Sequence, residues 1–599
     1  MPYAAPVALL LAALPILAIW GAVTAASATG HFLLLLLMFL IAVQVLAACL
    51  SERLVPSKLY PLLIVSVSIS LLYHFLLISP NLVGSDINHE YYFFSFVNNS
   101  GHWNPAYPES DPYNSLLSIT ILPVILSAVT GVDGVSVFKI IYPLIFSLVP
   151  VVLYSAFEPH IGKKQALLAV FFFMSYQAYY ADLTSIAREQ IAEVLVALFL
   201  MLILKNRLKT LTGKSILLIL IFGMIISHYS TAYIIMFFVV ISWLILRFRK
   251  KATPMPNLPL VFVVFALLWY VYGSSSASIY SLGGFGASVY QGILTQFSNP
   301  IARPQQVQAA LGVGWLPGPL HDLHRLVEYS VQFFILVGVL WLWRNRKSRV
   351  FGDIFLQFTL LALLTLVLSV FLPNFAAGLD LSRVYHLTLL FLAPACIVGG
   401  VVVFKWIVRA ATGLSGGLPA LHVRRLSRHD MSVIFVSVVI VMYFLFNVGF
   451  MWEIAGGPPT SISLGFNRMR YSDDVSIKAG FYSAYIPDED VASARWTSTY
   501  VSNAFLVCAD RTARYHELQS YALMSLPPST PLLYPNGEGG AFCSSATSLY
   551  TYISYFDGVE HVLTGPTYQS ETSHLNVDYL LASQNTIYSN GAGFILATP

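Results

Sequence analysis

The sequence predicts a polytopic α-helical membrane protein of about 13 spans, with a smaller α/β domain at its C-terminus. Of the 599 residues, 57% are hydrophobic and 10% are charged, and the mean hydropathy is +0.72. These values exclude an ordinary soluble protein. Apolar runs of about 18 residues recur, and each is long enough to cross a hydrocarbon core of roughly 30 Å. The composition changes after residue 450, where apolar runs become short and thirteen acidic residues accompany six basic ones.

Thirteen apolar segments make up the predicted membrane domain. The first has little flanking charge and is followed at once by a second, so we expect a retained helix rather than a cleaved signal peptide. The expected spans are 6–27, 31–50, 59–79, 136–155, 165–181, 189–205, 215–228, 230–247, 258–273, 326–343, 351–372, 384–404 and 431–450.

The Lys and Arg residues predict the orientation. If the N-terminus is cytoplasmic, one set of alternating loops holds 21 of the 32 basic residues, whereas the opposite loops hold five. Because cytoplasmic loops are enriched in Lys and Arg, we expect a multi-pass cell-membrane protein with loops 80–135 and 274–325 outside. If the apolar segment Ser115–Val129 were counted as a span, every later loop would change sides and the charge asymmetry would be lost. We therefore expect this segment to be a helix that lies on or dips into the outer surface. The net charge of +4 thus reflects topology, and no nucleic-acid partner is expected.

We expect two domains, a transmembrane domain at 1–450 and an extracytoplasmic domain at 451–599, which is of ordinary domain size. Local patterns in the second domain predict a helix start with acids in its first turn, two buried strands and a hairpin turn. These patterns lie at Pro487–Val491, Ala504–Val507, Asp578–Leu581 and Thr586–Gly591.

The four cysteines divide between the two predicted domains. Cys49 and Cys396 fall inside spans and are expected to be packing residues. Cys508 and Cys543 both lie in the predicted outer domain. An even pair outside the cytosol favours a structural disulfide over two free thiols.

The most polar point near a predicted span is the run Gly84–Tyr92. Asp86 and Glu90 are four residues apart, so on a helix they share a face, and His89 lies beside them. A carboxylate at this place can act as a general base, and we predict catalytic roles for Asp86, His89 and Glu90. Two alternatives stay open. Asp86 could only cap a helix that begins at Ile87, or Asp86 and Glu90 could bind a divalent metal ion, which these residue types do not specify.

A few basic residues lie at outer span boundaries, against the general charge bias. Guanidinium and ammonium groups at that depth can bind a lipid phosphate, and Arg binds its oxygens bidentately. The alternative is that these side chains reach the interface or pair with neighbouring acids, such as Glu189 and Asp380. The predicted substrate-binding residues are Lys139, Arg188, Arg383 and, at an outer turn, His228.

These motifs resemble those of the GT-C superfamily of polyprenyl-phosphate-sugar-dependent glycosyltransferases, near the protein mannosyltransferase and aminoarabinose-transferase branch. In particular they resemble an uncharacterised, largely archaeal group of membrane proteins placed in that superfamily. The likeness covers roughly residues 59–250, and the rest of the chain is similar only in layout. The adjacent Asp-Glu pair that is common in the superfamily is absent, and two extra spans precede the acidic loop. The matching motifs are Asp86–Glu90, Phe138–Pro143 and Ala187–Gln190.

The resemblance implies an inverting glycosyltransferase with a GT-C-like fold, in which the acid of the first external loop, here Asp86, is the base. Its donor would be a sugar on polyprenyl (dolichyl or undecaprenyl) phosphate, and its acceptor a cell-surface glycan, lipid or protein. The alternative is a transporter or flippase for a lipid-linked or polysaccharide substrate. A transporter would carry ionisable residues near span centres, whereas the charges here gather at one boundary. The one candidate cofactor is a divalent metal ion, which the sequence leaves open.

Overall fold

The computed structural model describes most of the chain. The described residues are 4–106, 111–251, 256–299, 303, 307–308, 317–346, 350–376, 380–414, 428–501, 506–524, 532–535, 541–543, 548–564 and 572–598.

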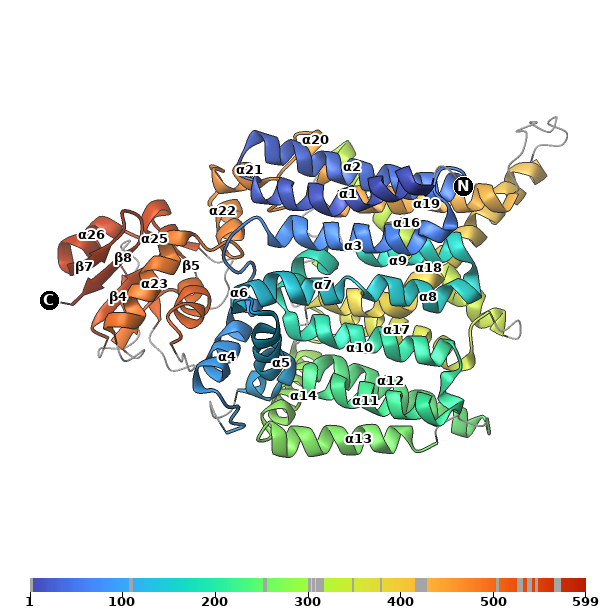
Figure 1. The fold of residues 1–599 in the computed structure, drawn as a ribbon, viewed down its shortest axis with the longest axis horizontal. Coiled ribbons are helices and arrows are strands. Elements are labelled where there is room, and N and C mark those ends of the chain that lie inside the picture. The colour runs from blue at the N-terminus through green and yellow to red at the C-terminus, as the bar shows by residue number, and fades with distance from the viewer. Residues whose placement is uncertain are drawn as a thin grey trace.

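All thirteen predicted spans fall on helices that run side by side in one bundle (Figure 1). The fourth span belongs to a continuous helical stretch that ends in α8. The helices are α1 (Ala4–Val23), α2 (Ala28–Leu50), α3 (Tyr60–Leu76), α8 (Val149–Ile161), α9 (Lys163–Ser175), α10 (Ala187–Leu204), α11 (Leu211–Ser227), α12 (Tyr229–Phe248), α13 (Leu258–Leu268), α16 (Pro319–Arg344), α17 (Asp353–Phe371), α18 (Leu381–Leu414) and α19 (Arg428–Asn447).

Within the described ranges, nine helices are long and apolar enough to cross a membrane. A tenth span results if α13 and α14 (Ala277–Gln296), which are bent by 109° to one another, are taken together. This number is below the predicted thirteen because α9 and α11 are short, and because Arg188, Glu189 and Glu193 make α10 polar at its start. The multi-pass membrane architecture is confirmed.

Helix α18 forms the centre of the bundle, and 94% of its apolar stretch is buried inside the protein. Two glycines allow α16 to cross it closely. A Cβ at Gly338 would lie 1.8 Å from the backbone oxygen of Ala395, and one at Gly399 would lie 1.9 Å from that of Phe334. Small residues at such crossings let two membrane helices pack backbone against backbone. This crossing fixes the helix that carries Arg383.

One end of the bundle carries two shorter helices, α4 (Asp86–Ser100) and α5 (Leu117–Thr130), which pack against each other (Figure 1). Both end at a glycine in the left-handed conformation, Gly101 and Gly131. The apolar segment predicted to lie outside the spans therefore forms a helix, as expected.

The C-terminal domain lies at the same end of the bundle as α4 and is built on small sheets (Figure 1). Helix α23 (Asp488–Tyr500) packs near a four-stranded sheet of order β1-β4-β8-β7. The domain also contains two two-stranded ribbons, β2-β3 and β5-β6. The strands are β1 (Val507–Cys508), β2 (Leu533–Pro535), β3 (Ala541–Cys543), β4 (Tyr550–Ile553), β5 (Val562–Thr564), β6 (Thr572–His574), β7 (Asn585–Ser589) and β8 (Phe594–Ala597).

Local patterns in this domain were confirmed in part. Helix α23 begins directly after Pro487, and Gly591 has a positive φ of 92° in the turn between β7 and β8, as expected. The predicted strand at Asp578–Leu581 is wrong, because these residues belong to α26 (Val577–Ser583). The side chain of Asn576 accepts a hydrogen bond from the Tyr579 N–H and so starts a helix there. In the predicted strand Ala504–Val507, residues 504 and 505 lie outside the described residues, and Val507 is in β1.

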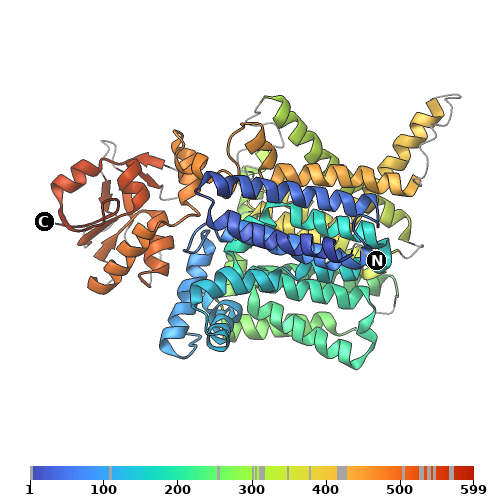
Figure 2. The ribbon, with the colours of Figure 1, turned by 45° about the horizontal axis from the view of Figure 1, so that its top comes forward.

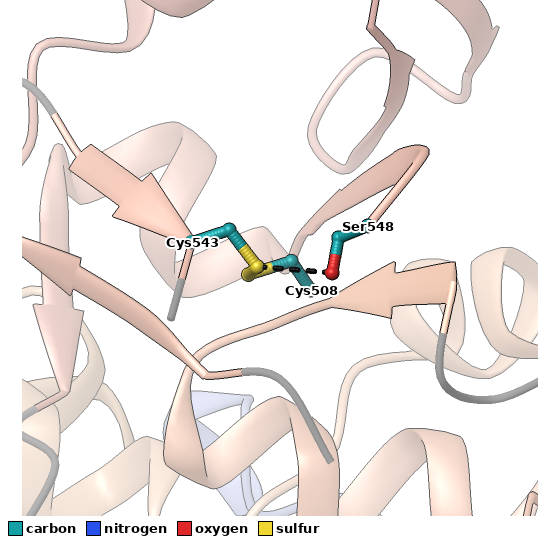
Figure 3. The surroundings of a disulfide bond; sticks show 3 residues. All are labelled: Cys508, Cys543 and Ser548. Atoms are coloured by element: carbon teal, nitrogen blue, oxygen red, sulfur yellow. Dashed lines mark hydrogen bonds between the residues drawn. A yellow bond between two sulfur atoms is a disulfide. The ribbon is translucent and has the colours of Figure 1, made fainter. Parts of the chain in front are cut away.

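The predicted disulfide is confirmed. Cys508 in β1 and Cys543 in β3 are bonded, with their Cα atoms 6.0 Å apart, and Ser548 Oγ lies 3.1 Å from Cys543 Sγ (Figure 3). The bond ties the main sheet to the β2-β3 ribbon. Cys49 and Cys396 are free and buried among the membrane helices, as expected.

The chain before α4 is fastened to the C-terminal domain. The Gly84 N–H donates to the Ala484 carbonyl (2.9 Å), and Asn81 Nδ2 donates to Asp488 Oδ1 (2.8 Å). Gly84 has a positive φ of 103°, and a Cβ there would lie 2.2 Å from that of Ser185. A rotated view shows the domain at the same end of the bundle (Figure 2). The entry into α4 is therefore held from two sides.

Candidate active site

Asp86 opens α4, and its side chain points to a guanidinium rather than to its own helix. The N-cap is Ser85, which makes no side-chain capping bond, and Asp86 Oδ2 accepts from Arg188 Nη2 at 2.8 Å. Helix capping therefore does not explain why an acidic residue stands at position 86. Glu90, one turn further on, faces the same guanidinium, as the four-residue spacing predicts.

Arg188 joins the two carboxylates of α4. Its Nη1 donates to Glu90 Oε1, and the ring of Tyr113 lies 4.2 Å from its Cζ. The Ala187 N–H at the start of α10 donates to the second oxygen of Glu90 (2.7 Å). The Arg188 side chain is only 3% exposed and that of Glu90 is 0%. A buried charge is tolerated when it is paired in this way, so Arg188 connects α4 to the bundle.

Arg383, at the start of α18, adds a second guanidinium. Its Nε and Nη2 both donate to Glu189 Oε2, at 2.9 and 2.5 Å. Its Nη1 lies 3.9 Å from Asp86 Oδ2. Asp86 therefore lies between Arg188 and Arg383. Of the predicted site residues, the structure brings Asp86, Glu90, Arg188 and Arg383 together.

The two carboxyl groups differ in access and in acidity. The Asp86 side chain is 36% exposed, whereas Glu90 is fully buried. Partial burial raises the pKa of Asp86, but the charges of Arg188 and Arg383 outweigh it and hold that pKa below its usual value. Burial raises the pKa of Glu90 to about 7, although Arg188 opposes this. Asp86 is thus an ionised and partly exposed carboxylate, and Glu90 is a buried partner of Arg188.

His89 forms a pair of its own beside this cluster. Its Nε2 lies 3.0 Å from Asp111 Oδ2, and its ring contacts that of Tyr113 at 4.4 Å between centroids. Burial lowers the pKa of His89, but the bond to Asp111 outweighs it and the net pKa is raised. Tyr113 also contacts Arg188, so His89 lies next to the cluster. Among the described residues, no hydrogen bond joins His89 to Asp86 or Glu90.

The two remaining predicted residues lie differently. His228 is buried at the start of α12, where its Nδ1 lies 2.7 Å from Thr231 Oγ1, within electrostatic range of Arg188 and Arg383. Lys139 is buried elsewhere, and its ammonium group donates to the Ser79 carbonyl. The structure therefore brings His228 close to the cluster and does not bring Lys139 into it.

Sequence reasoning missed several members of the site. Glu193 follows Glu189 by one turn and pairs with His386 on α18 (3.1 Å), a spacing that the sequence could have shown. Loop residues such as Tyr113 gave no signal, because their approach to Arg188 depends on how the loop folds back. The missed residues are Asp111, Tyr113, Asp182, Glu193, Ser382 and His386. The pairing of Glu189 with Arg383 corresponds to the ion-pair alternative that the sequence left open.

The C-terminal domain contacts α4 through the segment that contains the π-helix Arg514–Leu518. Ser520 Oγ donates to Asn88 Oδ1 at 2.9 Å, and the Leu82 N–H donates to Tyr521 Oη at 3.0 Å. Asn88 also bonds back to the Gly84 carbonyl (2.7 Å). Helix α4 is therefore held between the bundle and the C-terminal domain, with Asp86 at its start.

The residues present do not fit a metal ion on Asp86 and Glu90. Both carboxylates already face Arg188, which supplies the positive charge that a cation would bring. Across the described ranges, no group of three His, Cys, Asp or Glu side chains is arranged to hold a metal.

These features define a class: a multi-pass membrane protein with a buried arginine–carboxylate cluster at one end of its helical bundle, next to an α/β domain. The chain belongs to the family described as "Predicted membrane protein (DUF2206)", whose model matches residues 214–596. No curated protein matches the chain.

Three solved structures of an oligosaccharyltransferase from Archaeoglobus fulgidus are similar to this chain. The complex of this enzyme, AglB, with an inhibitory peptide and a dolichol-phosphate is 11% identical, with a TM-score of 0.49 over 92% of this chain and 75% of that one. The apo form is 12% identical (TM-score 0.43, 79% and 65%). The complex with Zn and sulfate is 12% identical (TM-score 0.38, 90% and 73%).

Proposed function

We propose that the protein is an integral-membrane glycosyltransferase that moves a sugar from a polyprenyl phosphate to a cell-surface glycan, lipid or protein. The observation that carries the proposal is the position of Asp86, a partly exposed carboxylate flanked by Arg188 and Arg383. A base next to paired guanidinium groups suits a reaction in which a hydroxyl loses a proton while a phosphate leaves.

The chemistry follows from these groups. The acceptor hydroxyl oxygen attacks the anomeric carbon of the donor, and its proton passes to Asp86. The bond from that carbon to the phosphate oxygen breaks, and the phosphate leaves with its electron pair. Arg383 is the phosphate ligand in this proposal, because its side chain is 14% exposed and its Nη1 only approaches Asp86 at 3.9 Å. Attack from the side opposite the phosphate inverts the anomeric centre.

Glu90 and Arg188 have supporting roles in this proposal. Glu90 is completely buried and bonded to the Ala187 N–H and Arg188, so it positions the guanidinium rather than meeting a substrate. His89, which is paired with Asp111, and His228, which lies within electrostatic range of Arg188 and Arg383, are proposed to bind the sugar.

Topology and domain limits belong to the same proposal. We assign residues 1–450 to the membrane domain and 451–599 to an extracytoplasmic domain. Since α4 packs against the C-terminal domain, both would face the outside, where lipid-linked sugars and surface acceptors meet. The excess of basic residues in the opposite loops supports this orientation.

One observation favours a transporter or flippase as the second candidate. Glu193 and His386 form a pair that is 0% exposed, inside the bundle and beyond the cluster at Asp86. Ionisable residues inside membrane helices are typical of proton-coupled transport. The variant Glu193→Gln separates the candidates. If the protein is a transporter, transport by this variant should no longer depend on a proton gradient. If it is a transferase, the variant should still transfer sugar in detergent, where no gradient exists.

The experiment that tests the proposed function is mass spectrometry of surface glycans, glycolipids and lipid-linked sugars from a deletion strain. We expect a lipid-linked sugar to accumulate and one surface structure to lose that sugar, with both changes reversed by the wild-type gene but not by Asp86→Asn. Unchanged profiles, or rescue by Asp86→Asn, would refute the proposal.

A further inference from the structure

A cavity lined by apolar and cationic side chains lies at the end of the bundle opposite the C-terminal domain. It has a volume of about 510 Å³ and is lined from three sides, by the junction of α8 and α9, by α16 and by α18. Its wall includes His160, Trp341, Val402, Lys405 and Arg409. The C-terminal part of α18, coloured yellow, extends from the bundle at this end (Figure 1, Figure 2). The cavity therefore has no part in the site around Asp86.

One face of α18 gives the cavity two zones. Val398, Val402, Lys405 and Arg409 all line it, and their spacing of four, three and four residues places them on one side of a helix. The apolar pair lies toward the centre of the bundle, and the cationic pair lies toward the end of α18. A ligand with an apolar part and an anionic part would match these zones in that order.

The depth of the cavity fits a lipid headgroup. Arg383 and Lys405 lie on the same helix, 22 residues apart, which corresponds to about 33 Å along an α-helix. The hydrocarbon core of a bilayer is about 30 Å thick. If Arg383 lies at one boundary of this core, Lys405 and Arg409 lie at the other boundary, where phosphates of the second leaflet are found.

Among the described residues, the two cations have no acidic partner that would compete with a ligand. Neither Lys405 nor Arg409 takes part in an ion pair with any residue in the described portion of the chain. Trp341 and Trp406 also line the cavity, and Trp406 is 50% exposed. Tryptophan next to Lys or Arg is typical of the level of lipid headgroups.

From these features we propose that the cavity binds an anionic glycerophospholipid of the leaflet opposite the C-terminal domain. Lys405 and Arg409 contact the headgroup phosphate, and the first methylene groups of the acyl chains lie against Val398 and Val402. Basic pockets between membrane helices have this preference in general. A soluble phosphate would leave the valine wall exposed, and a zwitterionic lipid would bring a positive group to two cations.

The test uses the full-length protein in phosphatidylcholine nanodiscs. Phosphatidylglycerol with brominated chains is titrated in, and binding is followed by quenching of tryptophan fluorescence and by native mass spectrometry of retained lipid. We expect the variant Lys405→Gln/Arg409→Gln to bind about 25-fold more weakly, since each cation near an anionic headgroup contributes about fivefold in affinity. The charge-preserving variant Lys405→Arg/Arg409→Lys is expected to bind like the parent.

The matched control is Arg247→Gln/Arg249→Gln, which removes two exposed cations at the end of α12 without touching the cavity. It should retain phosphatidylglycerol as the parent does. Equal loss in the two double variants would overturn the proposal, because binding would then be a general surface effect. Equal retention of brominated phosphatidylcholine would overturn it as well, and so would displacement of the lipid by millimolar inorganic phosphate.

Discussion

Asp86 and Glu90 carry the same functional group, a carboxylate, in two different surroundings. They lie one turn apart on α4 and bind the same guanidinium, yet only Asp86 is accessible. Its pKa is held below the usual value, whereas that of Glu90 is raised to about 7. A pKa near 7 would suit a general base, but complete burial removes Glu90 from contact with a substrate. Access therefore decides in favour of Asp86.

The variant Asp86→Asn should fold normally and be nearly inactive. Asn keeps the size of the side chain and can still accept from Arg188, but it cannot take the proton of an acceptor hydroxyl. Loss of a general base typically lowers the rate by about 10²–10⁴-fold. The measurement is turnover of a purified lipid-linked sugar, together with thermal stability.

Asp133→Asn is the matched control. Asp133 lies between α5 and the span that follows it, and its side chain caps a short helix by accepting from the Ser136 N–H. Since Asn caps as well as Asp, this variant should keep full activity. In the parent, the lowered pKa of Asp86 keeps this carboxylate ionised at neutral pH, so its own protonation should reduce kcat/KM only below the pH at which an ordinary aspartate is protonated. Activity of Asp86→Asn within a few-fold of the parent would remove Asp86 as the base.

The activity should depend on both the charge of Arg383 and the planar fork of its guanidinium group. Arg383→Lys keeps the positive charge but cannot make the two bonds to Glu189 or bind a phosphate bidentately. We expect activity to fall in the order parent, Lys, Ala. A raised donor KM would indicate equal binding in the ground and transition states, and a lowered kcat would indicate a contact that tightens on the leaving phosphate. Unchanged turnover of Arg383→Ala at limiting donor would exclude this role.

At the scale of elements, α18 connects the two ends of the protein. It carries Arg383 at its start and Lys405 and Arg409 near its end, and its position depends on the close crossing with α16. The crossing is possible because Gly338 and Gly399 lack side chains. The site around Asp86 therefore depends on helix packing far from it, as well as on its own bonds.

Gly399→Ala should destabilise the protein by separating these helices. The added methyl group would lie 1.9 Å from the Phe334 oxygen, which is backbone and cannot turn aside. Overpacking of this kind costs about 1–3 kcal/mol, so we expect a lower thermal midpoint of the purified protein. Gly480→Ala in the helix α22 (Val475–Tyr482), where the new methyl group meets no atom within 4 Å, is the control. It should be neutral or slightly stabilising. Equal midpoints for the two variants would contradict the importance of the crossing.

At the scale of the whole molecule, the site is assembled from parts of the chain that are far apart. Asp86 is on α4, Arg188 on α10 and Arg383 on α18, and the C-terminal domain reaches α4 through the bond from Ser520 to Asn88. The 21 basic residues of one set of loops and the position of the C-terminal domain at the other end agree with a single orientation in the membrane.

This orientation can be tested by labelling. In a background without Cys49 and Cys396, single cysteines at Asn98 and Ser498, which are exposed on α4 and α23, should react with an impermeant thiol reagent on intact cells. Cysteines at Ser348 and Gly416, in stretches of the sequence rich in Lys and Arg, should react only after the cells are opened. The reverse pattern would place Asp86 in the cytoplasm and contradict the proposed use of a donor on the outer face.

The sequence by itself determined the thirteen helical segments, the α/β nature of the C-terminal domain and the disulfide, because length, hydropathy and cysteine location act locally along the chain. It also indicated Asp86, Glu90, Arg188 and Arg383, since charges are costly at a membrane boundary and therefore stand out. It misassigned Asp578–Leu581, where an Asn cap outweighs the strand-like composition.

Only the tertiary structure decided which of these charges meet. It joined Asp86 and Glu90 through Arg188, set Glu189 on Arg383, left Lys139 apart and added Tyr113 from a loop. It also showed that Asp86 is no helix cap. Spacing predicts neighbours within one helix, but pairing between helices depends on how whole helices pack, and that is set by distributed contacts such as the crossing of α16 and α18.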